Sequence, residues 1–479
     1  MLDHPRRAAI LGIVLSLTLT TAPPAATNSP KNAAARPSGR FTLPPVSRRV
    51  LRNGLVAIVA ERHSVPTVAV TIMIRAGAAQ NPPGRAGAAD VLAELLTLGT
   101  KTRNASKIAD EVDALGATLS ASSAYDSTTV SLTGLSADAA RILDLAADLV
   151  RNPAFPPSEL AELKTRRAGA LKRQIDSPQT LADRAFQKSL FGSHPYAQPA
   201  DGTLKSLDAL TETDLKSLYD AWYVPNAAVV AVAGDVASDA VMPEIERLFG
   251  SWTKKPLPAA AASPADPAPP DGARVLVIDK PDLTQGQIRI GRLGVRRSTP
   301  DWYELQVANY ILGGGGFSSR LVKRIRSEKG LTYGVGSQFA ARRLTGPFTI
   351  STFTPNATVG ETVEEALKVL SKLRTEGPGE QELTDAKSFF VGGFPLALET
   401  PAQLAQQLLN IELFGLPPDY LATYQDRFAA VTEDDVKRVL KTRFDLSSLV
   451  IVAVSKAADV KESLAKFGRV EVIPFSSME

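Results

Sequence analysis

Cysteine is absent from this sequence of 479 residues, and histidine is scarce. The lack of cysteine excludes disulfides and a lipid-modified N-terminal cysteine, so an exported form would depend on packing for its stability. The three histidines are His4, His63 and His194. His4 lies in an apolar N-terminal segment, and the other two stand in HSVP and HPYA, which are typical of turns. We therefore expect His63 and His194 to be solvated loop residues rather than metal ligands.

Several other signals are missing as well. The net charge of +4 is spread along the chain without a basic block interleaved with aromatics, which argues against nucleic acid as a partner. The glycine run Gly313–Gly316 lacks the Gly-Lys-Ser/Thr of a phosphate-binding loop. The apolar run at residues 8–19 is shorter than the roughly 20 residues that span a bilayer, so we expect no stable membrane span.

The N-terminus has the order of a secretory signal peptide. Arg6 and Arg7 precede the apolar run, and the small-residue stretch TTAPPAATNSP follows it. We predict a cleaved signal peptide over residues 1–26 and a flexible lead-in over residues 27–40. An uncleaved interfacial anchor is the alternative. Export of a chain without cysteine favours the bacterial periplasm as its location.

The remaining chain is long enough for two domains of about 200 residues each. A Pro/Ala-rich segment, residues 254–273, is too stiff and extended to build a core, and it predicts a linker. The linker separates an N-terminal domain, residues 41–253, from a C-terminal domain, residues 274–479.

The two halves repeat one design. Residues 210–236 and 431–457 align without a gap, each with a Thr-Glu helix start, an amphipathic helix and an apolar strand. Residues 176–192 and 399–415 also align with each other, and they precede the first pair in both halves. Two pairs at nearly the same spacing indicate an internal duplication. The mixture of strands and long helices predicts an α+β fold with two homologous domains, each a mostly antiparallel sheet with helices packed on one face.

Four stretches carry a resemblance to a known family: LRNGLVAIVAERHSVPTVAV, LTQGQIRIG, ILGGGGFSSRLVKRIRSEKGLTYGVGS and YVPNAAVVAVAGDV. The chain resembles the pitrilysin/insulinase-type zinc metallopeptidases, or inverzincins, of the half-length bacterial kind. It is also similar to the non-catalytic subunits of mitochondrial processing peptidase. The resemblance implies that the two domains form half of a peptide chamber and that a homologous half-length chain supplies the other half.

Members of that family that cut peptides carry H-x-x-E-H on a helix, where two histidines bind zinc and the glutamate activates water. The equivalent stretch is GAADVLAELLTLGT, residues 87–100, whose apolar spacing predicts a helix that ends before Gly99. Asp90 and Glu94 stand at the histidine positions, and Ala93 stands at the position of the water-activating glutamate.

The third zinc ligand of the family would fall near Ala170 or Leu171, and residues 163–175 contain no acid. With the ligands and the general base altered, we expect no metal and no other cofactor in this chain. Asp90 and Glu94 would form a polar helix face beside a cavity that zinc occupies in other members. A harder, weakly held cation on these two carboxylates is the alternative.

The second half retains a further motif, an arginine and a tyrosine seven residues apart that reach the substrate in the family's active sites. In RSEKGLTY these residues are Arg326 and Tyr333. A guanidinium can anchor substrate carbonyls, and a phenol can donate toward the oxyanion that forms during peptide hydrolysis. The alternative is a surface arginine and a tyrosine at the start of a strand, both without a catalytic role.

The resemblance also implies a mobile substrate-binding loop, made of Gly313, Gly314, Gly315, Gly316 and Phe317. Four glycines after the predicted helix at residues 307–312 indicate unusual torsions or close backbone contacts. Substrate also pairs with an edge strand in the family, by β-augmentation. The matching segment is VAVTIMIRAG, residues 68–77, which is either such an edge strand or a core strand.

The resemblance, together with the altered zinc motif, implies a non-catalytic subunit of a heterodimeric zinc metallopeptidase that degrades or processes peptides, with this chain inactive alone. Arg326 and Tyr333 would be supplied in trans to a partner subunit that carries H-x-x-E-H and zinc. Two alternatives stay open. One is a peptide-binding or structural pseudo-peptidase without turnover, and the other is a homodimeric peptidase with a non-standard metal site at Asp90 and Glu94.

Overall fold

The structure is a computed structural model that describes residues 42–258, 265–270 and 272–478. The predicted signal peptide and lead-in lie outside the described residues, as does part of the predicted linker. No described residue of that linker belongs to a helix or strand. The limits of the domains on either side of it stay a prediction. Among the described helices, none combines the length and the apolar character that crossing a bilayer requires.

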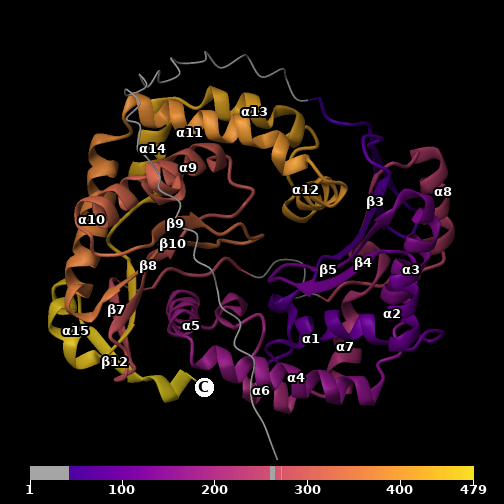
Figure 1. Cartoon of the computed structure of the whole chain (residues 1–479), viewed down its shortest axis with the longest axis horizontal. Helices are drawn as coiled ribbons and strands as arrows, with labels where there is room; N and C mark the ends of the chain where they lie inside the picture. Colours follow the sequence, from indigo (N-terminus) through magenta and orange to yellow (C-terminus); the bar gives the residue numbers. More distant parts are fainter. Residues whose placement is uncertain (1–41, 259–264, 271, 479) are drawn as a thin grey trace, which may run out of the picture. The chain divides into compact units, whose positions relative to one another are not determined.

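Two six-stranded sheets lie at the centres of the two halves (Figure 1). The first sheet has the order β1-β2-β6-β3-β5-β4. Its strands are β1 (Val46–Val50), β2 (Val56–Glu61), β3 (Thr67–Ile74), β4 (Thr118–Ser123), β5 (Thr128–Leu135) and β6 (Ala228–Gly234). The second sheet has the order β12-β7-β11-β8-β10-β9. Its strands are β7 (Arg274–Asp279), β8 (Gln285–Leu293), β9 (Val335–Phe339), β10 (Pro347–Pro355), β11 (Val450–Ser455) and β12 (Val470–Pro474).

The two sheets are built alike, as a duplicated chain requires. β6 lies between β2 and β3, parallel to the first and antiparallel to the second. β11 has the same relation to β7 and β8. The outermost strands differ, because β1 is antiparallel to β2 whereas β12 is parallel to β7. The predicted α+β class with two repeated sheets is confirmed, and both sheets are mixed.

Helices connect the strands in the same order in both halves. Those of the first half are α1 (Ala88–Leu95), α2 (Ala105–Ala114), α3 (Ala139–Arg151), α4 (Pro157–Ile175), α5 (Pro178–Phe191), α6 (Leu204–Ala209), α7 (Glu212–Trp222) and α8 (Ser238–Phe249). Those of the second half are α9 (Trp302–Asn309), α10 (Val359–Glu376), α11 (Glu380–Gly393), α12 (Pro401–Phe414), α13 (Tyr420–Ala430), α14 (Glu433–Arg443) and α15 (Ala457–Leu464). The repeated α7 and α14 begin with equivalent capping boxes, on Thr211 and Thr432.

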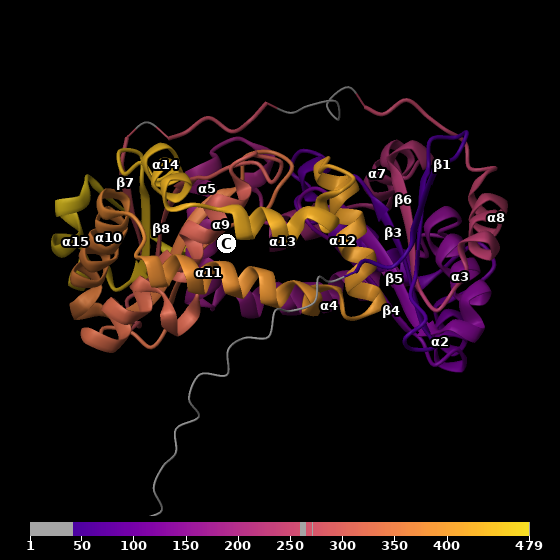
Figure 2. The ribbon, with the colours of Figure 1, turned by 90° about the horizontal axis from the view of Figure 1, so that it is seen from above.

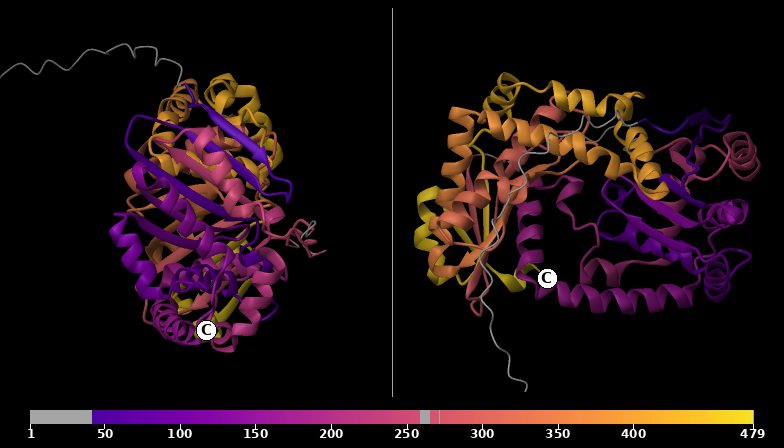
Figure 3. Two further views of the ribbon diagram at one scale, coloured as in Figure 1. Left: turned by 90° about the vertical axis from the view of Figure 1, so that its right-hand side faces the viewer. Right: turned by 45° about the horizontal axis from the view of Figure 1, so that its top comes forward.

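Each half lends one helix to the sheet of the other half. α5 packs on β8 and β11 of the second sheet, beside which it lies in Figure 3, and α12 packs on β3 and β6 of the first (Figure 2). Side chains alternate along a strand. In β11, Val450, Val452 and Val454 pack with α5, whereas Ile451 and Ala453 belong to the core formed with the helices of the second half. Helices thus cover both faces of the second sheet at β11, whereas the sequence predicts helices on one face only.

A buried arginine of the second half lies in a cage of three rings from the first half. Arg342 follows β9 and has 6% of its surface exposed. The central carbon of its guanidinium lies 3.9 Å from the ring centroid of Tyr125, 4.6 Å from that of Tyr196 and 5.2 Å from that of Phe191. Cations over desolvated rings contribute about 2 kcal/mol or more. This cage therefore ties the β9–β10 loop to the first half.

Candidate functional site

The predicted helix over the altered zinc motif is confirmed as α1. It begins after Gly87, whose φ of +86° favours glycine and whose missing Cβ would lie 2.8 Å from the carbonyl oxygen of Asp201. Val91, Leu92 and Leu95 are buried in the core of the first half, and so is the methyl group of Ala93. Asp90 and Glu94 lie on the partly exposed face of the helix.

Two arginines of α4 bind the carboxylates of Asp90 and Glu94. Arg167 donates from Nη1 to Asp90 Oδ2 at 2.5 Å and from Nε to Glu94 Oε2 at 2.9 Å. Its Nη2 lies 2.7 Å from Glu94 Oε2 and donates to the carbonyl oxygen of Asp90 at 3.2 Å. Arg166 donates from Nη2 to Glu94 Oε1 at 2.6 Å. Two negative charges thus face two positive charges across the contact between α1 and α4.

Arg166 and Arg167 also favour the ionised form of Glu94. Burial raises the pKa of the Glu94 carboxyl, but hydrogen bonds and charges from Arg166 and Arg167 outweigh this effect, so the pKa lies below its ordinary value. Burial lowers the pKa of the Arg167 guanidinium, and the charges and hydrogen bonds of Asp90 and Glu94 more than reverse that effect. Both members of the pair are therefore charged at neutral pH.

The residues at the family's zinc positions do not fit a zinc ion. The carboxylates of Asp90 and Glu94 point at guanidinium groups, and Ala93 offers no atom that could accept a proton from water. Across the described residues, no group of three or more His, Cys, Asp and Glu side chains could hold a metal ion. Near the position expected for a third ligand, α4 supplies the positive charges of Arg166 and Arg167.

The two histidines of the described chain lie away from this site. His63 is exposed, and its Nδ1 lies 2.7 Å from Asp235 Oδ1. His194 is half-buried, which corrects the expectation of a solvated residue, because its ring packs against those of Phe191 and Tyr196 at 6.0 and 4.7 Å between centroids. Burial lowers the pKa of His194.

The Arg/Tyr motif lies at the surface of the second half. Arg326 is half-buried in a π-helical segment, Val322–Glu328, and the central carbon of its guanidinium lies 4.6 Å from the ring centroid of Phe317. Phe317 is itself 72% exposed, and Tyr333, just before β9, is 82% exposed. In the part of the chain that the structure describes, no hydrogen bond or ion pair joins Arg326 or Tyr333 to the acids of α1.

The glycine run Gly313–Gly316 packs beside the segments that carry Arg326 and Tyr333. α9 ends at Asn309 and continues as a π-helical turn, Tyr310–Gly314, where the sequence predicts one helix over residues 307–312. A Cβ on Gly313 would lie 2.6 Å from the backbone nitrogen of Ser337 in β9, and Gly316 has a φ of +57°. The expected close contact and unusual torsion thus both occur. The run holds Phe317 against Arg326 at one end and packs on the strand after Tyr333 at the other.

The suggestion that residues 68–77 form a substrate-binding edge strand is wrong. β3 lies between β6 and β5 with its backbone paired on both sides, and β8 is enclosed in the same way in the second sheet. The pattern VTIMI fits a core strand equally well, and only the sheet order decides between the two. The edge beside the altered site is β4, which pairs with β5 alone.

A groove of about 410 Å³ runs beside β4. It lies between α1, α2 and this edge strand and is lined largely by apolar side chains, among them Leu98, Ile108, Val112, Leu119 and Ala121. Glu94 stands at its end toward the altered zinc motif. An unpaired strand edge next to an apolar groove is the geometry that binds an extended peptide, with pockets for alternate side chains.

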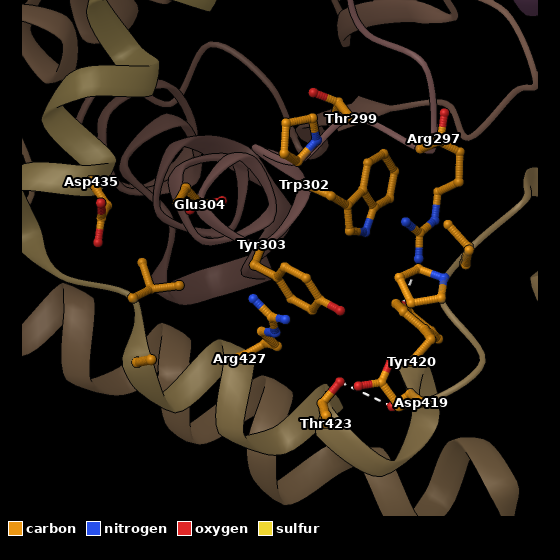
Figure 4. Close-up of a pocket in the computed structure, with 16 residues that line it drawn as sticks. Arg297, Thr299, Trp302, Tyr303, Glu304, Asp419, Tyr420, Thr423, Arg427 and Asp435 are labelled. Atoms are coloured by element: carbon orange, nitrogen blue, oxygen red, sulfur yellow. Dashed lines mark hydrogen bonds between the residues drawn. The ribbon is translucent and has the colours of Figure 1, made fainter.

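Another cavity, of about 450 Å³, lies between the start of α9 and α13 (Figure 4). Arg297 lies in its wall, with the central carbon of its guanidinium 4.1 Å from the Trp302 ring centroid. Its Nη2 donates to the Tyr420 hydroxyl at 2.6 Å. None of the predicted site residues lines this cavity.

Fold and site together define a metallopeptidase-like chain whose metal-motif helix carries arginine-paired acids. The family model of insulinase (peptidase family M16) matches residues 56–203, and that of the peptidase M16 inactive domain matches residues 209–390. An uncharacterized zinc protease of Mycobacterium leprae is 30% identical over 380 residues, which are 79% of this chain and 84% of that protein. The chain belongs to peptidase family M16.

Two further relatives differ in what their names say. A non-peptidase homolog of Helicobacter pylori is 24% identical over 400 residues, which are 83% of this chain and 91% of that protein. The crystal structure of a peptidase M16 inactive domain from Pseudomonas fluorescens matches with a TM-score of 0.81 and 28% identity, over 86% of this chain and 98% of that one. This chain is thus similar both to proteins named as proteases and to proteins named as inactive.

Proposed function

We propose that this chain is the non-catalytic subunit of a heterodimeric zinc metallopeptidase that degrades or processes peptides. The observation that carries the proposal is Ala93, a buried methyl group at the position from which water would be activated. A general base contributes about 10² to 10⁴ in rate, and no neighbouring side chain of α1 is free to replace it, since Asp90 and Glu94 are bound by arginines. In this proposal, the partner subunit supplies zinc and the base.

This chain would supply the substrate-binding and oxyanion-stabilising groups. Arg326 would anchor the substrate backbone and Tyr333 would donate from its hydroxyl to the developing oxyanion. The high exposure of Tyr333 supports a role toward another molecule. Gly313, Gly314, Gly315, Gly316 and Phe317 would form the adjoining substrate loop, and two such half-length chains would enclose a peptide chamber.

The same proposal places the protein in the periplasm, after removal of the signal peptide. The order of charged, apolar and small residues at the N-terminus supports this location. Mass spectrometry of the chain recovered from the periplasmic fraction tests it. An N-terminus close after residue 26 is expected, and recovery of the intact chain from the cytoplasm would refute it.

The experiment is co-expression with a half-length chain of the same genome that carries H-x-x-E-H. We expect the two chains to co-purify and to cleave peptides only together. Because removal of one oxyanion donor costs about 3 kcal/mol, Tyr333→Phe should lower kcat by about 10² to 10³, and Arg326→Ala should raise KM as well. Arg141→Ala is the matched control, since Arg141 is exposed and pairs with Asp138 one turn away. Full activity of the partner alone would refute the proposal.

A peptide-binding protein without turnover is the second candidate, and the open edge of β4 beside its groove favours it. The same co-expression separates the two. Tight peptide binding by this chain with no cleavage by any mixture would support the second candidate. A homodimeric peptidase would need a metal at Asp90 and Glu94, where the arginines of α4 lie.

A further inference from the structure

We propose that Arg167 takes the place of the zinc ion in this domain, as a cation that is fixed to α4 and joins α4 to α1. The inference concerns this chain alone and does not depend on a partner subunit. It starts from the disagreement between the family's metal motif and the residues that this chain has in its place.

The charges support the replacement. Asp90 and Glu94 carry two negative charges on one face of α1, separated by one turn. A zinc ion would bring two positive charges to that face, and Arg166 and Arg167 bring the same number. Neither acid is left without a cation, which would be costly at a site where the two side chains are only 21% and 33% exposed.

The geometry supports it as well. The guanidinium of Arg167 contacts three oxygens of α1, namely Asp90 Oδ2, the carbonyl oxygen of Asp90 and Glu94 Oε2. Its fork is planar and always charged, so it can hold two carboxylates in fixed directions as a lysine cannot. Its side chain is 19% exposed, and this partial burial strengthens the pair beyond a surface ion pair.

The sequence positions explain what changed. The resemblance implies a third zinc ligand near Ala170 or Leu171, which lie in α4, so a metal bound there would join α1 and α4. Here α4 supplies the cation itself, and α1 supplies the acceptors. The join between α1 and α4 (Figure 1) is preserved, but a guanidinium has no empty orbital to accept water or a carbonyl oxygen. The structural part of the metal's role is kept and its chemical part is lost.

The first test measures zinc binding to chains in which the histidines are restored. Asp90→His with Glu94→His recreates two ligands on one face of α1, and adding Arg167→Ala clears the space between them. Titration calorimetry with ZnCl₂ on the full chain should show at least about tenfold tighter binding to the triple variant than to the double variant, because a fixed positive charge repels the ion. Equal affinities would overturn the inference.

The second test measures stability and needs no metal site. The melting temperature of the wild type should be unchanged by EDTA. Arg167→Met should lower the melting temperature by at least about 3 °C and Arg167→Lys by less, whereas the exposed control Arg141→Ala should change it by under about 1 °C. In a background of Asp90→Asn and Glu94→Gln, Arg167→Met should cost much less, as expected for one coupled group. A wild type destabilised by EDTA, or an Arg167→Met variant as mild as the control, would overturn the inference.

Discussion

Phe186 offers the sharpest test of the exchanged helices, because it belongs to the first half but packs on the second sheet. Phe186 is 2% exposed. Its Cζ lies so close to β8 that a Cβ added to Gly291 would be only 2.9 Å from it. The ring therefore rests directly on the backbone of β8. We predict that Phe186→Ala destabilises the second sheet, although the substitution lies in the first half.

The magnitude follows from the packing. Phe→Ala substitutions in cores cost about 3–5 kcal/mol, and the cost is higher where the site cannot collapse. β8 is held between β11 and β10, so it cannot move toward the cavity without breaking its ladders. We therefore expect about 4 kcal/mol. Since each 1.4 kcal/mol is tenfold, the best-protected amides of β8 and β11 should exchange about a thousandfold faster.

Urea unfolding and hydrogen exchange followed by mass spectrometry measure these two effects. Phe389→Ala is the matched control, because Phe389 is 55% exposed and the same atoms are removed. The control should cost about 1 kcal/mol or less. The reasoning is refuted if Phe186→Ala unfolds at the urea concentration of the control, or if the added exchange is confined to β3 and β6.

Three further predictions follow from the structure. Arg342→Ala should lower the free energy of unfolding by about 3 kcal/mol in urea titrations, since the cation–π contacts and two buried methylenes are lost, whereas Arg343→Ala next to it should be nearly neutral. Gly313→Ala should lower the free energy of unfolding by about 2 kcal/mol, because the added Cβ would lie 2.6 Å from the Ser337 nitrogen. In the same assay Gly392→Ala should be neutral or stabilising, because its added Cβ would face open space. The folded state lowers the pKa of Glu94, so the ionised carboxylate contributes fully to stability above its ordinary pKa of 4.5, and this contribution is lost as the pH falls through the folded-state pKa. The stability difference between wild type and Glu94→Gln, measured by acid unfolding, should therefore shrink below pH 4.5.

Local features of the structure were predictable from sequence, because they depend on neighbours along the chain. The helix at α1 follows from its apolar spacing, and the equivalent starts of α7 and α14 follow from Thr211 and Thr432. The α+β class and the repeated order of strands follow from the duplication, which fixes what one half must share with the other.

Non-local partners were not predictable in the same way. An apolar stripe on residues 178–191 shows that one face is buried, but not that the covering sheet belongs to the other half. The alternation in residues 67–74 is the same for an interior and an edge strand, and the pairing of β3 with β5 and β6 decides the matter. His194 is half-buried because Phe191 and Tyr196 close over it, which the turn signal HPYA does not reveal.

The candidate site shows the same division. Sequence identified Asp90, Ala93 and Glu94 by their spacing, and it showed that residues 163–175 contain no acid. It did not show which residue faces the two acids, although the adjacent Arg166 and Arg167 in that segment were a usable signal.

The exchange of α5 and α12 makes each half of the chain depend on the other. A protein cut within the linker would yield two pieces, each of which bears a helix that the other requires and a bare apolar sheet face. Alone, each piece would be prone to aggregate; mixed, they should complement each other into one particle. The halves are therefore not interchangeable modules, and recombination that moved one of them into a foreign chain would produce an incomplete protein.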